Sequence, residues 1–175
     1  MSCAVQQILQ AAKPVVVSVN GVVIPRDAIA RETQYHPAAK ASEAWLSAAR
    51  ALVIRELLLR RARQLGIAAV PLKDERGRRE TEEDAVIRSL IEQEITTPEP
   101  DETVCRRYYQ QNRDRFRVRK DEAAEAPFEQ VSTRIADYLR ECVRRRAIAQ
   151  YIARLVSAAE VTGIPIQGAQ SHRVY

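Results

Sequence analysis

Residues 15–24 read VVVSVNGVVI, two short runs of β-branched residues on either side of Asn20-Gly21. Valine and isoleucine favour extended backbone, and asparagine followed by glycine tolerates positive φ at both central positions of a tight turn. This pattern predicts a β-hairpin. An isolated hairpin is only marginally stable in water, so a further strand or a helix must cover it. Residues 160–164 (EVTGI) are the remaining segment typical of a strand, so we expect the hairpin and this C-terminal strand to form a small sheet.

The composition indicates a mainly α protein around that small sheet. The chain has 175 residues, 46% hydrophobic and 29% charged, with only five glycines. A chain of this size buries about 70% of the surface that its unfolded form exposes, which is enough for a real core. Its apolar runs are much shorter than the roughly 20 residues that cross a bilayer, so we expect no membrane association. The first residues, MSCAVQQILQAAKP, lack a basic leader, so we expect a cytoplasmic protein, or a periplasmic one if a signal peptide was removed.

Outward from the hairpin, apolar residues recur at three- and four-residue steps, which is typical of helices. The first helix should stop near His36-Pro37, because a residue before proline is pushed out of helical geometry. Gly66 suits the left-handed cap of the second helix. The expected helices are residues 25–35, 38–65, 80–95, 101–115 and 127–158, with residues 67–72 as a connector.

Few side chains suit a catalytic or metal site. His36 lies at an expected helix stop and His172 in the C-terminal tail, so neither has a neighbour that would orient it as a base. Cys3, Cys105 and Cys142 are widely separated and form no CxxC pair, which favours free thiols in a reducing compartment. The sequence has no nucleophile elbow and no glycine-rich phosphate loop. We therefore expect no catalytic residue, no metal and no cofactor.

Basic and aromatic residues are interleaved between residues 103 and 120, and a second basic cluster lies at residues 144–146. Arginine beside aromatic rings could follow a phosphate backbone and stack on bases, which is the nucleic-acid interpretation. Alternatively, the arginines complement helix dipoles and the tyrosines pack in the core. A third interpretation is a surface that holds other polypeptides through apolar patches rimmed by basic residues. The candidate client-binding residues are Trp45, Tyr108, Tyr109 and Phe116, rimmed by Arg106, Arg107 and Arg113.

The order of these segments resembles a known family. The hairpin, the long helix with RELLLRRARQLGI (55–67) and the segment DETVCRRYYQQNRDRF (101–116) together resemble the N-terminal chaperone region of parvulin-type peptidyl-prolyl isomerases. This family includes SurA- and PrsA-like folding factors, and the nearest resemblance is to the NifM-like branch, associated with maturation of the nitrogenase iron protein. In the family a final long helix and strand return to complete the N-terminal region, and residues 127–164 match them. The resemblance implies one chaperone-like domain over residues 1–175, formed by residues 14–116 and 127–165.

The resemblance also implies that a catalytic domain is absent. Between the two matched parts the family carries a parvulin domain with two histidines and glycine-rich turns. This chain has residues 117–126 there, RVRKDEAAEA, without histidine or glycine. No parvulin catalytic residue can be carried over, because no position matches one. We expect a chaperone or client-binding module, with its enzymatic activity left open. The alternatives are retained or partner-assisted prolyl isomerisation, and a basic helical protein that binds nucleic acid.

The expected partners are unfolded or maturing client polypeptides. A homodimer is a second possibility, because exchanging the C-terminal helix between two chains across a short connector is a low-cost route to a dimer. Nucleic acid is the less favoured partner, since the net charge of +5 is modest and no known nucleic-acid-binding module is present.

Overall fold

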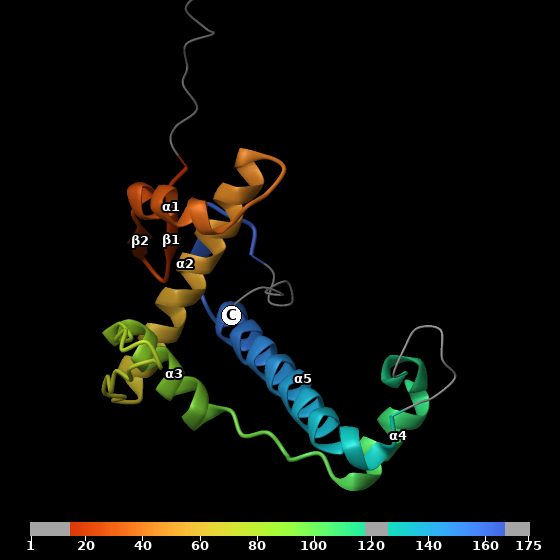
Figure 1. The fold of residues 1–175 in the computed structure, drawn as a ribbon. Coiled ribbons are helices and arrows are strands. Elements are labelled where there is room, and N and C mark those ends of the chain that lie inside the picture. The colour runs from red at the N-terminus through yellow and green to blue at the C-terminus, as the bar shows by residue number, and fades with distance from the viewer. Residues whose placement is uncertain (1–14, 118–125, 167–175) are drawn as a thin grey trace, which may run out of the picture. The chain divides into compact units, whose positions relative to one another are not determined.

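The computed structural model describes residues 15–117 and 126–166. The chain divides into two compact units, Met1–Leu90 with Ile152–Tyr175 (unit 1) and Ile91–Tyr151 (unit 2). Most of the described residues are helical, and three short strands form one sheet (Figure 1). The predicted mainly α fold with a small β-sheet is therefore confirmed. That the whole chain acts as a single domain stays a prediction.

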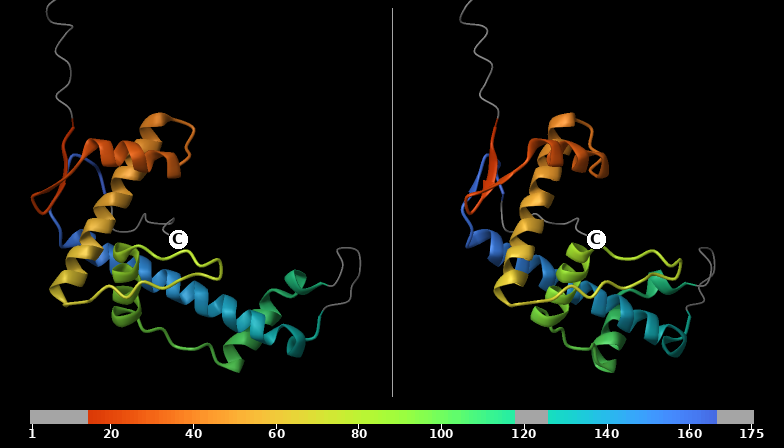
Figure 2. Two further views of the ribbon diagram at one scale, coloured as in Figure 1. Left: turned by 60° about the vertical axis from the view of Figure 1, so that its left-hand side comes forward. Right: turned by 90° about the vertical axis from the view of Figure 1, so that its left-hand side faces the viewer.

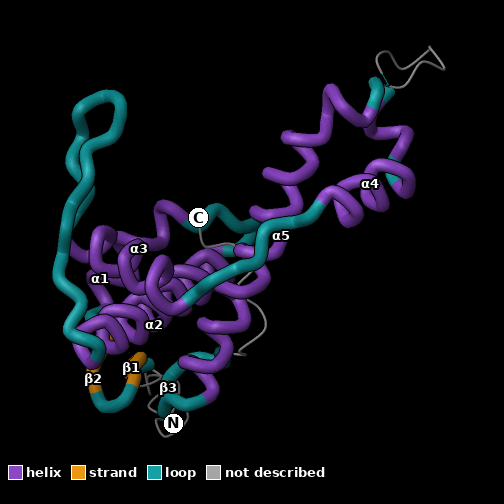
Figure 3. The backbone as a smooth tube through the Cα atoms, turned by 90° about the horizontal axis from the view of Figure 1, so that it is seen from below, coloured by secondary structure: helices purple, strands orange, loops and turns teal. Residues whose placement is uncertain are grey.

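The sheet lies in unit 1 and joins the N-terminal hairpin to a strand near the C-terminus. Strands β1 (Val17–Val19) and β2 (Val22–Ile24) pair antiparallel across a turn in which Asn20 has a φ of 48° and Gly21 a φ of 81°. Strand β3 (Val161–Thr162) pairs antiparallel with the other side of β1, so the strand order is β2-β1-β3 (Figure 3). The Asn20 N–H donates to the Glu160 carbonyl oxygen at 2.8 Å, and the Glu160 N–H donates to Asn20 Oδ1 at 3.0 Å. The predicted hairpin and its pairing with residues 160–164 are confirmed.

Helix α2 packs against this sheet, and helix α1 packs against α2. Helix α1 (Arg26–Glu32) continues into a 3₁₀ turn, η1 (Thr33–Tyr35), and the helical path ends at His36, before proline, as predicted. Helix α2 (Ala41–Gln64) contacts both α1 and β1, and it begins at Ala41 rather than at the predicted Ala38. Gly66 takes the left-handed conformation, with φ of 66°, and ends the helix as predicted. The side chains that are least exposed here are Val17, Val19, Ile29, Ala48, Ala49, Val53 and Ala62.

A hairpin-like arm, residues 72–80, follows α2, where the sequence pattern predicted a connector and the start of a helix. Lys73 and Arg79 form an antiparallel bridge, and Gly77, with φ of 75°, lies in the turn between them. The two runs lie side by side and project from the helices of unit 1 (Figures 2 and 3). Helix α3 (Glu82–Glu94) begins directly after the arm, two residues later than predicted.

Unit 2 contains α4 and most of α5, whose residues 152–157 belong to unit 1, and both helices are close to those predicted. Helix α4 (Glu102–Gln111) begins at Asp101, whose side chain accepts the Val104 N–H at 2.8 Å. It is followed by a 3₁₀ turn, η2 (Arg113–Phe116), so the predicted helix 101–115 changes type near its end. Helix α5 (Phe128–Ser157) matches the predicted helix 127–158. Most of the predicted connector 117–126 lies outside the described residues.

None of the helices that the structure describes is both long enough and apolar enough to cross a bilayer.

Candidate functional site

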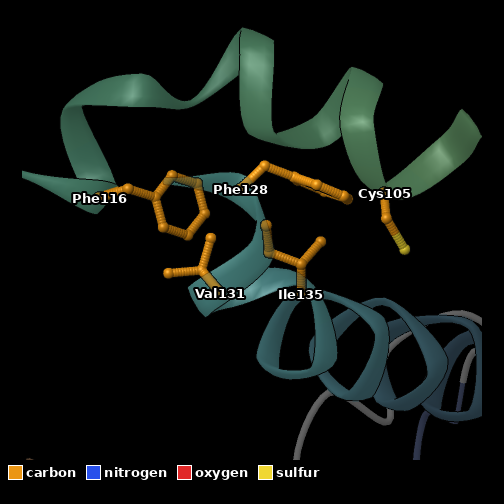
Figure 4. Close-up of a cluster of buried hydrophobic side chains, with 5 residues drawn as sticks. All are labelled: Cys105, Phe116, Phe128, Val131 and Ile135. Carbon is orange, nitrogen blue, oxygen red and sulfur yellow. The ribbon is translucent and has the colours of Figure 1, made fainter. Parts of the chain in front are cut away.

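The aromatic residues predicted as a client-binding group on α4 and η2 gather against α5 in unit 2. Phe116 is buried at 8% exposure, and Tyr108 and Tyr109 are half-buried beside it. Burial of aromatic rings removes a large apolar area from water, which makes this cluster a core for unit 2. The fully packed members, shown in Figure 4 between α4 and the start of α5, are Cys105, Phe116, Phe128, Val131 and Ile135.

Tyr109 connects the two chain segments that flank residues 118–125. Its ring centroid lies 5.2 Å from that of Phe116 and 5.8 Å from that of Phe128. Its hydroxyl donates a hydrogen bond to the Ala126 carbonyl oxygen at 2.7 Å. The Ala126 N–H in turn donates to the Phe116 carbonyl oxygen at 2.8 Å. The two ends of the described chain that flank residues 118–125 are therefore joined by a direct backbone hydrogen bond.

A second group of rings lies at the partly exposed edge of this cluster. Tyr108 lies 5.4 Å from Tyr138 and 6.3 Å from Phe116, measured between ring centroids. Arg115 donates a hydrogen bond to the Tyr108 hydroxyl, and its guanidinium carbon lies 5.8 Å from the centre of the Tyr138 ring. Hydrogen bonds to Tyr138 and Tyr108 raise the pKa of Arg115, so its charge is fixed at any working pH.

The three arginines of the predicted rim are exposed but differ in their surroundings. Arg106 lies over the Phe128 ring, 4.3 Å from its centre, and bonds Glu102 at 2.7 Å. Arg107 forms no ion pair or side-chain hydrogen bond with the residues that the structure describes, and Arg113 lies in η2. An open depression of about 380 Å³ lies on this side of α4, and it is lined by Glu102, Thr103, Arg106, Arg107 and Gln110.

Trp45 lies on α2 in unit 1, half-buried, whereas the other six predicted site residues belong to unit 2. The structure therefore brings together Tyr108, Tyr109 and Phe116 by ring contacts, with Arg106 on the same cluster. Phe116 is a core residue in this arrangement.

The sequence pattern did not predict which apolar side chains are exposed. On unit 2 they are Val104, Tyr138 and Val143, each between 42% and 43% exposed. The sequence held part of the information needed to predict this exposure. Cys105, Tyr108 and Tyr109 form the more buried stripe of α4, and Val104 lies one position outside that stripe. In unit 1 the exposed large apolar residues are Val15, Val16, Val22, Val23, Tyr35, Val70 and Leu72.

The described part of the chain offers little chemistry for catalysis or metal binding. No group of three or more His, Cys, Asp or Glu side chains stands close enough there to hold a metal ion. His36, which follows η1, has its Nε2 3.0 Å from Oε1 of Glu32 in α1. Burial, together with the nearby Asp101 and Glu102, raises the pKa of the Cys105 thiol, so it stays protonated at neutral pH and is a poor nucleophile.

Comparison of the chain with protein-family models, with curated proteins and with solved structures finds no match in any of the three.

Proposed function

We propose that this protein is a chaperone or client-binding module similar to the non-catalytic part of parvulin-type foldases, assisting the folding or maturation of other polypeptides. The observation that carries the proposal is the contact between the flanks of residues 118–125, where the Ala126 N–H donates to the Phe116 carbonyl oxygen at 2.8 Å. This is the place at which the resembling family carries its catalytic domain. Tyr109 contacts Phe116 on one side of residues 118–125 and Ala126 on the other. The two flanks therefore meet within unit 2 with no need of such a domain.

The pairing of the chain's two ends in unit 1 also supports the proposal. Strand β3 adds to β1 in the register Ser18↔Thr162 and Val19↔Val161. The hydroxyl groups of Ser18 and Thr162 are 2.8 Å apart, which adds a side-chain hydrogen bond to the ladder. The resemblance implies a returning helix and strand of this kind, and α5 followed by β3 has that order.

Client binding would use apolar side chains that the fold leaves uncovered. Apolar contact is non-directional and roughly proportional to the area removed from water, so it suits partners that share no fixed sequence. In unit 2 the exposed residues Val104, Tyr138 and Val143 provide such contacts on α4 and α5. Arg107, with no carboxylate partner among the described residues, adds an attraction for acidic clients.

The nucleic-acid alternative is less well supported, because many of the basic residues that suggested it are already paired. Arg106 bonds Glu102 at 2.7 Å, Arg117 bonds Asp114 at 2.6 Å, and Arg145 pairs with Glu141 at 3.5 Å. Paired arginines release fewer counterions on meeting a phosphate backbone, which weakens binding to it.

The test is a pair of assays on the intact chain. Light scattering by a chemically unfolded client should fall in the presence of equimolar protein, because exposed apolar surface captures the client before it aggregates. The rate of cis–trans isomerisation of a proline-containing peptide should equal the rate in buffer. Absence of protection at excess protein would contradict the proposal, and isomerisation above the buffer rate would replace it with the enzymatic alternative.

A pair of variants locates the binding surface. V104S/V143S removes apolar groups from α4 and α5, whereas Q111S/Q150S changes exposed polar residues on the same two helices. One fully buried CH₂ contributes about 0.8 kcal/mol, and each of these two valines is less than half exposed before the client binds. We therefore expect V104S/V143S to lose about 0.8 kcal/mol in total and to need about fourfold more protein for the same protection. Q111S/Q150S should behave as the unchanged chain. An equal loss of protection in both variants would show that the client binds elsewhere on the protein.

A further inference from the structure

The three-stranded sheet of unit 1 has one buried face. Val17 and Val19 of β1 are each 1% exposed, and Ile24 of β2 is 8% exposed. The register pairs Val17 with Ile24, so these side chains project to the same side of the sheet. Helix α2 contacts both strands and packs beside them (Figure 2). Because side chains alternate along a strand, the residues between these buried ones project to the opposite side.

That opposite side, the outer face, is partly apolar. It comprises Ser18, Val23 and Thr162, which the register places next to one another, and Val16, which directly precedes the buried Val17. Antiparallel sheets with one solvated face usually carry polar residues on that face, and Ser18 and Thr162 fit this rule. Val16 and Val23 do not, and each is 56% exposed. The described chain therefore leaves apolar side chains of the sheet uncovered.

The segment that leads into this face has an amphipathic sequence. Residues 1–14, MSCAVQQILQAAKP, lie outside the described residues and directly precede the extended chain that enters β1. Their larger apolar residues recur at three- and four-residue steps, which is the spacing of one helix face. With 3.6 residues per turn, the central apolar residues fall within an arc of about 100° and three glutamines fall on the other side. The apolar set is Val5, Ile8, Leu9 and Ala12, and the glutamines are Gln6, Gln7 and Gln10.

A segment with this pattern needs a surface to cover its apolar side. A helix of about 12 residues is marginal in water without tertiary packing. The segment has one charged side chain, Lys13, so apolar contact and not charge has to hold it. Pro14 pushes Lys13 out of helical geometry, which allows the chain to turn before β1. Only residues 13–15 separate Ala12 from Val16, so the effective concentration of the segment at the outer face is about millimolar.

We propose that residues 1–12 dock as an amphipathic helix on the outer face of the sheet, with Val5, Ile8 and Leu9 against Val16 and Val23. A helix of this length extends for about 18 Å, and neighbouring strands are about 4.8 Å apart, so one helix is long enough to cross all three strands. A second copy of the chain is a less favourable occupant, because its binding costs translational and rotational freedom that the attached segment does not lose.

The docked segment goes beyond the proposed function and does not depend on it. The outer face belongs to unit 1, whereas the client contacts proposed on Val104, Tyr138 and Val143 belong to unit 2. The test therefore follows the segment itself and needs no client. A docked segment in a chain that fails to protect clients would contradict the proposed function alone.

The experiment measures hydrogen exchange by mass spectrometry at the amides of residues 4–12, in the intact protein and in a free peptide of residues 1–14. We expect these amides to exchange about tenfold more slowly in the intact protein, because a docked helix protects them. V16S/V23S removes the apolar groups of the outer face and should bring exchange within about twofold of the free peptide. V16I/V23I keeps the face apolar and should retain the protection.

The control variant is V70S/L72S, which removes two exposed apolar side chains of unit 1 that lie outside the sheet. It should leave the exchange of residues 4–12 unchanged. Exchange at the amides of α2, read in the same measurement, establishes that unit 1 is intact in each variant. V23S alone changes a single exposed side chain, and it should give an intermediate loss of protection even if V16S/V23S loosens α2.

Four results would overturn the docked segment. Exchange in the intact protein at the rate of the free peptide would mean that the segment does not dock. Protection that persists in both V16S/V23S and V23S would mean that it docks on another surface. An equal loss in V70S/L72S would mean that the outer face has no special part. Protection that rises with protein concentration would mean that a second copy supplies the segment.

Discussion

Gly163 lies where two distant segments of unit 1 pass close to each other. Its φ is 83°, and a Cβ atom at this position would lie 2.2 Å from the backbone oxygen of Val16. Gly66 has a similar φ of 66°, but nothing lies within 4 Å of the place its Cβ would occupy. Gly66→Ala should therefore lower the free energy of unfolding by about 1 kcal/mol, the cost of the left-handed backbone alone. Gly163→Ala should cost about 3 kcal/mol or more, because backbone must also move.

Urea denaturation of the two glycine variants measures the difference. Gly66→Ala serves as the control for the backbone conformation, so the excess loss in Gly163→Ala reports the close approach to Val16. Equal losses in the two variants would contradict the packing of residues 161–164 beside β1.

For single residues, the sequence predicted backbone conformations that depend on neighbouring residues, but not contacts between residues far apart in the chain. The turn at Asn20-Gly21 and the cap at Gly66 follow from the conformational freedom of those residues and their immediate neighbours. The constraint on Gly163 comes from Val16, at the other end of the chain, and no local pattern encodes it. Tyr109 was predicted as a client-binding or core residue, but its role depends on Ala126, which only the folded chain brings within reach.

Among the elements, the helices were predictable because their apolar residues repeat with a helical period, as in α2 and α5. The arm was not predictable, because its sequence, LKDERGRRE (72–80), does not alternate apolar and polar residues. Its ladder depends on backbone hydrogen bonds and on Asp74, whose side chain closes the turn. Charged runs of this kind are typical of solvated connectors, so the pattern alone favours the wrong structure.

The start of α3 provides a prediction about pH. Asp84 accepts hydrogen bonds from the Thr81 hydroxyl at 2.6 Å and from Arg55 at 2.8 Å, and these bonds lower its pKa below the ordinary value of 3.8. A carboxyl whose folded pKa is depressed stabilises the fold above the unfolded pKa, and loses that contribution as pH falls through the folded pKa. Asp84→Asn should therefore lower the free energy of unfolding by about 1 kcal/mol at neutral pH, an effect moderated by partial exposure. The difference from the unchanged chain should shrink in acid.

Denaturant unfolding at neutral pH and at about pH 2, below the ordinary carboxyl range, tests this prediction. Glu82→Gln is the matched control, because this substitution removes the same charge from the same first turn of α3. The Glu82 side chain is exposed and forms no ion pair with the described residues. A loss in Asp84→Asn that equals that of Glu82→Gln, or that persists undiminished in acid, would show that the bonds to Arg55 and Thr81 contribute nothing.

For the whole molecule, the central feature is that unit 1 contains residues from both ends of the described chain. Ile152, Val156 and Ile164 are between 3% and 8% exposed, and they belong to the unit that contains the N-terminal hairpin. Burying three such side chains contributes roughly 5–9 kcal/mol, comparable with the entire net stability of a domain, about 5–15 kcal/mol. The sequence predicted this return of the chain through its strand pattern at residues 160–164. Exchange of the returning helix between two copies stays a prediction, to be checked by sedimentation at two concentrations.

The most direct test of this architecture compares thermal unfolding of the full chain with that of a chain ending at Phe116. The shorter chain lacks α5 and β3, so β1 loses one of its two partners and unit 1 loses the side chains of residues 152–164. The account predicts that the shorter chain has no cooperative transition at the melting temperature of the full chain, and that adding a separate peptide of residues 126–166 restores part of it. A chain of residues 1–116 that melts cooperatively, and at the same temperature as the full protein, would contradict the account.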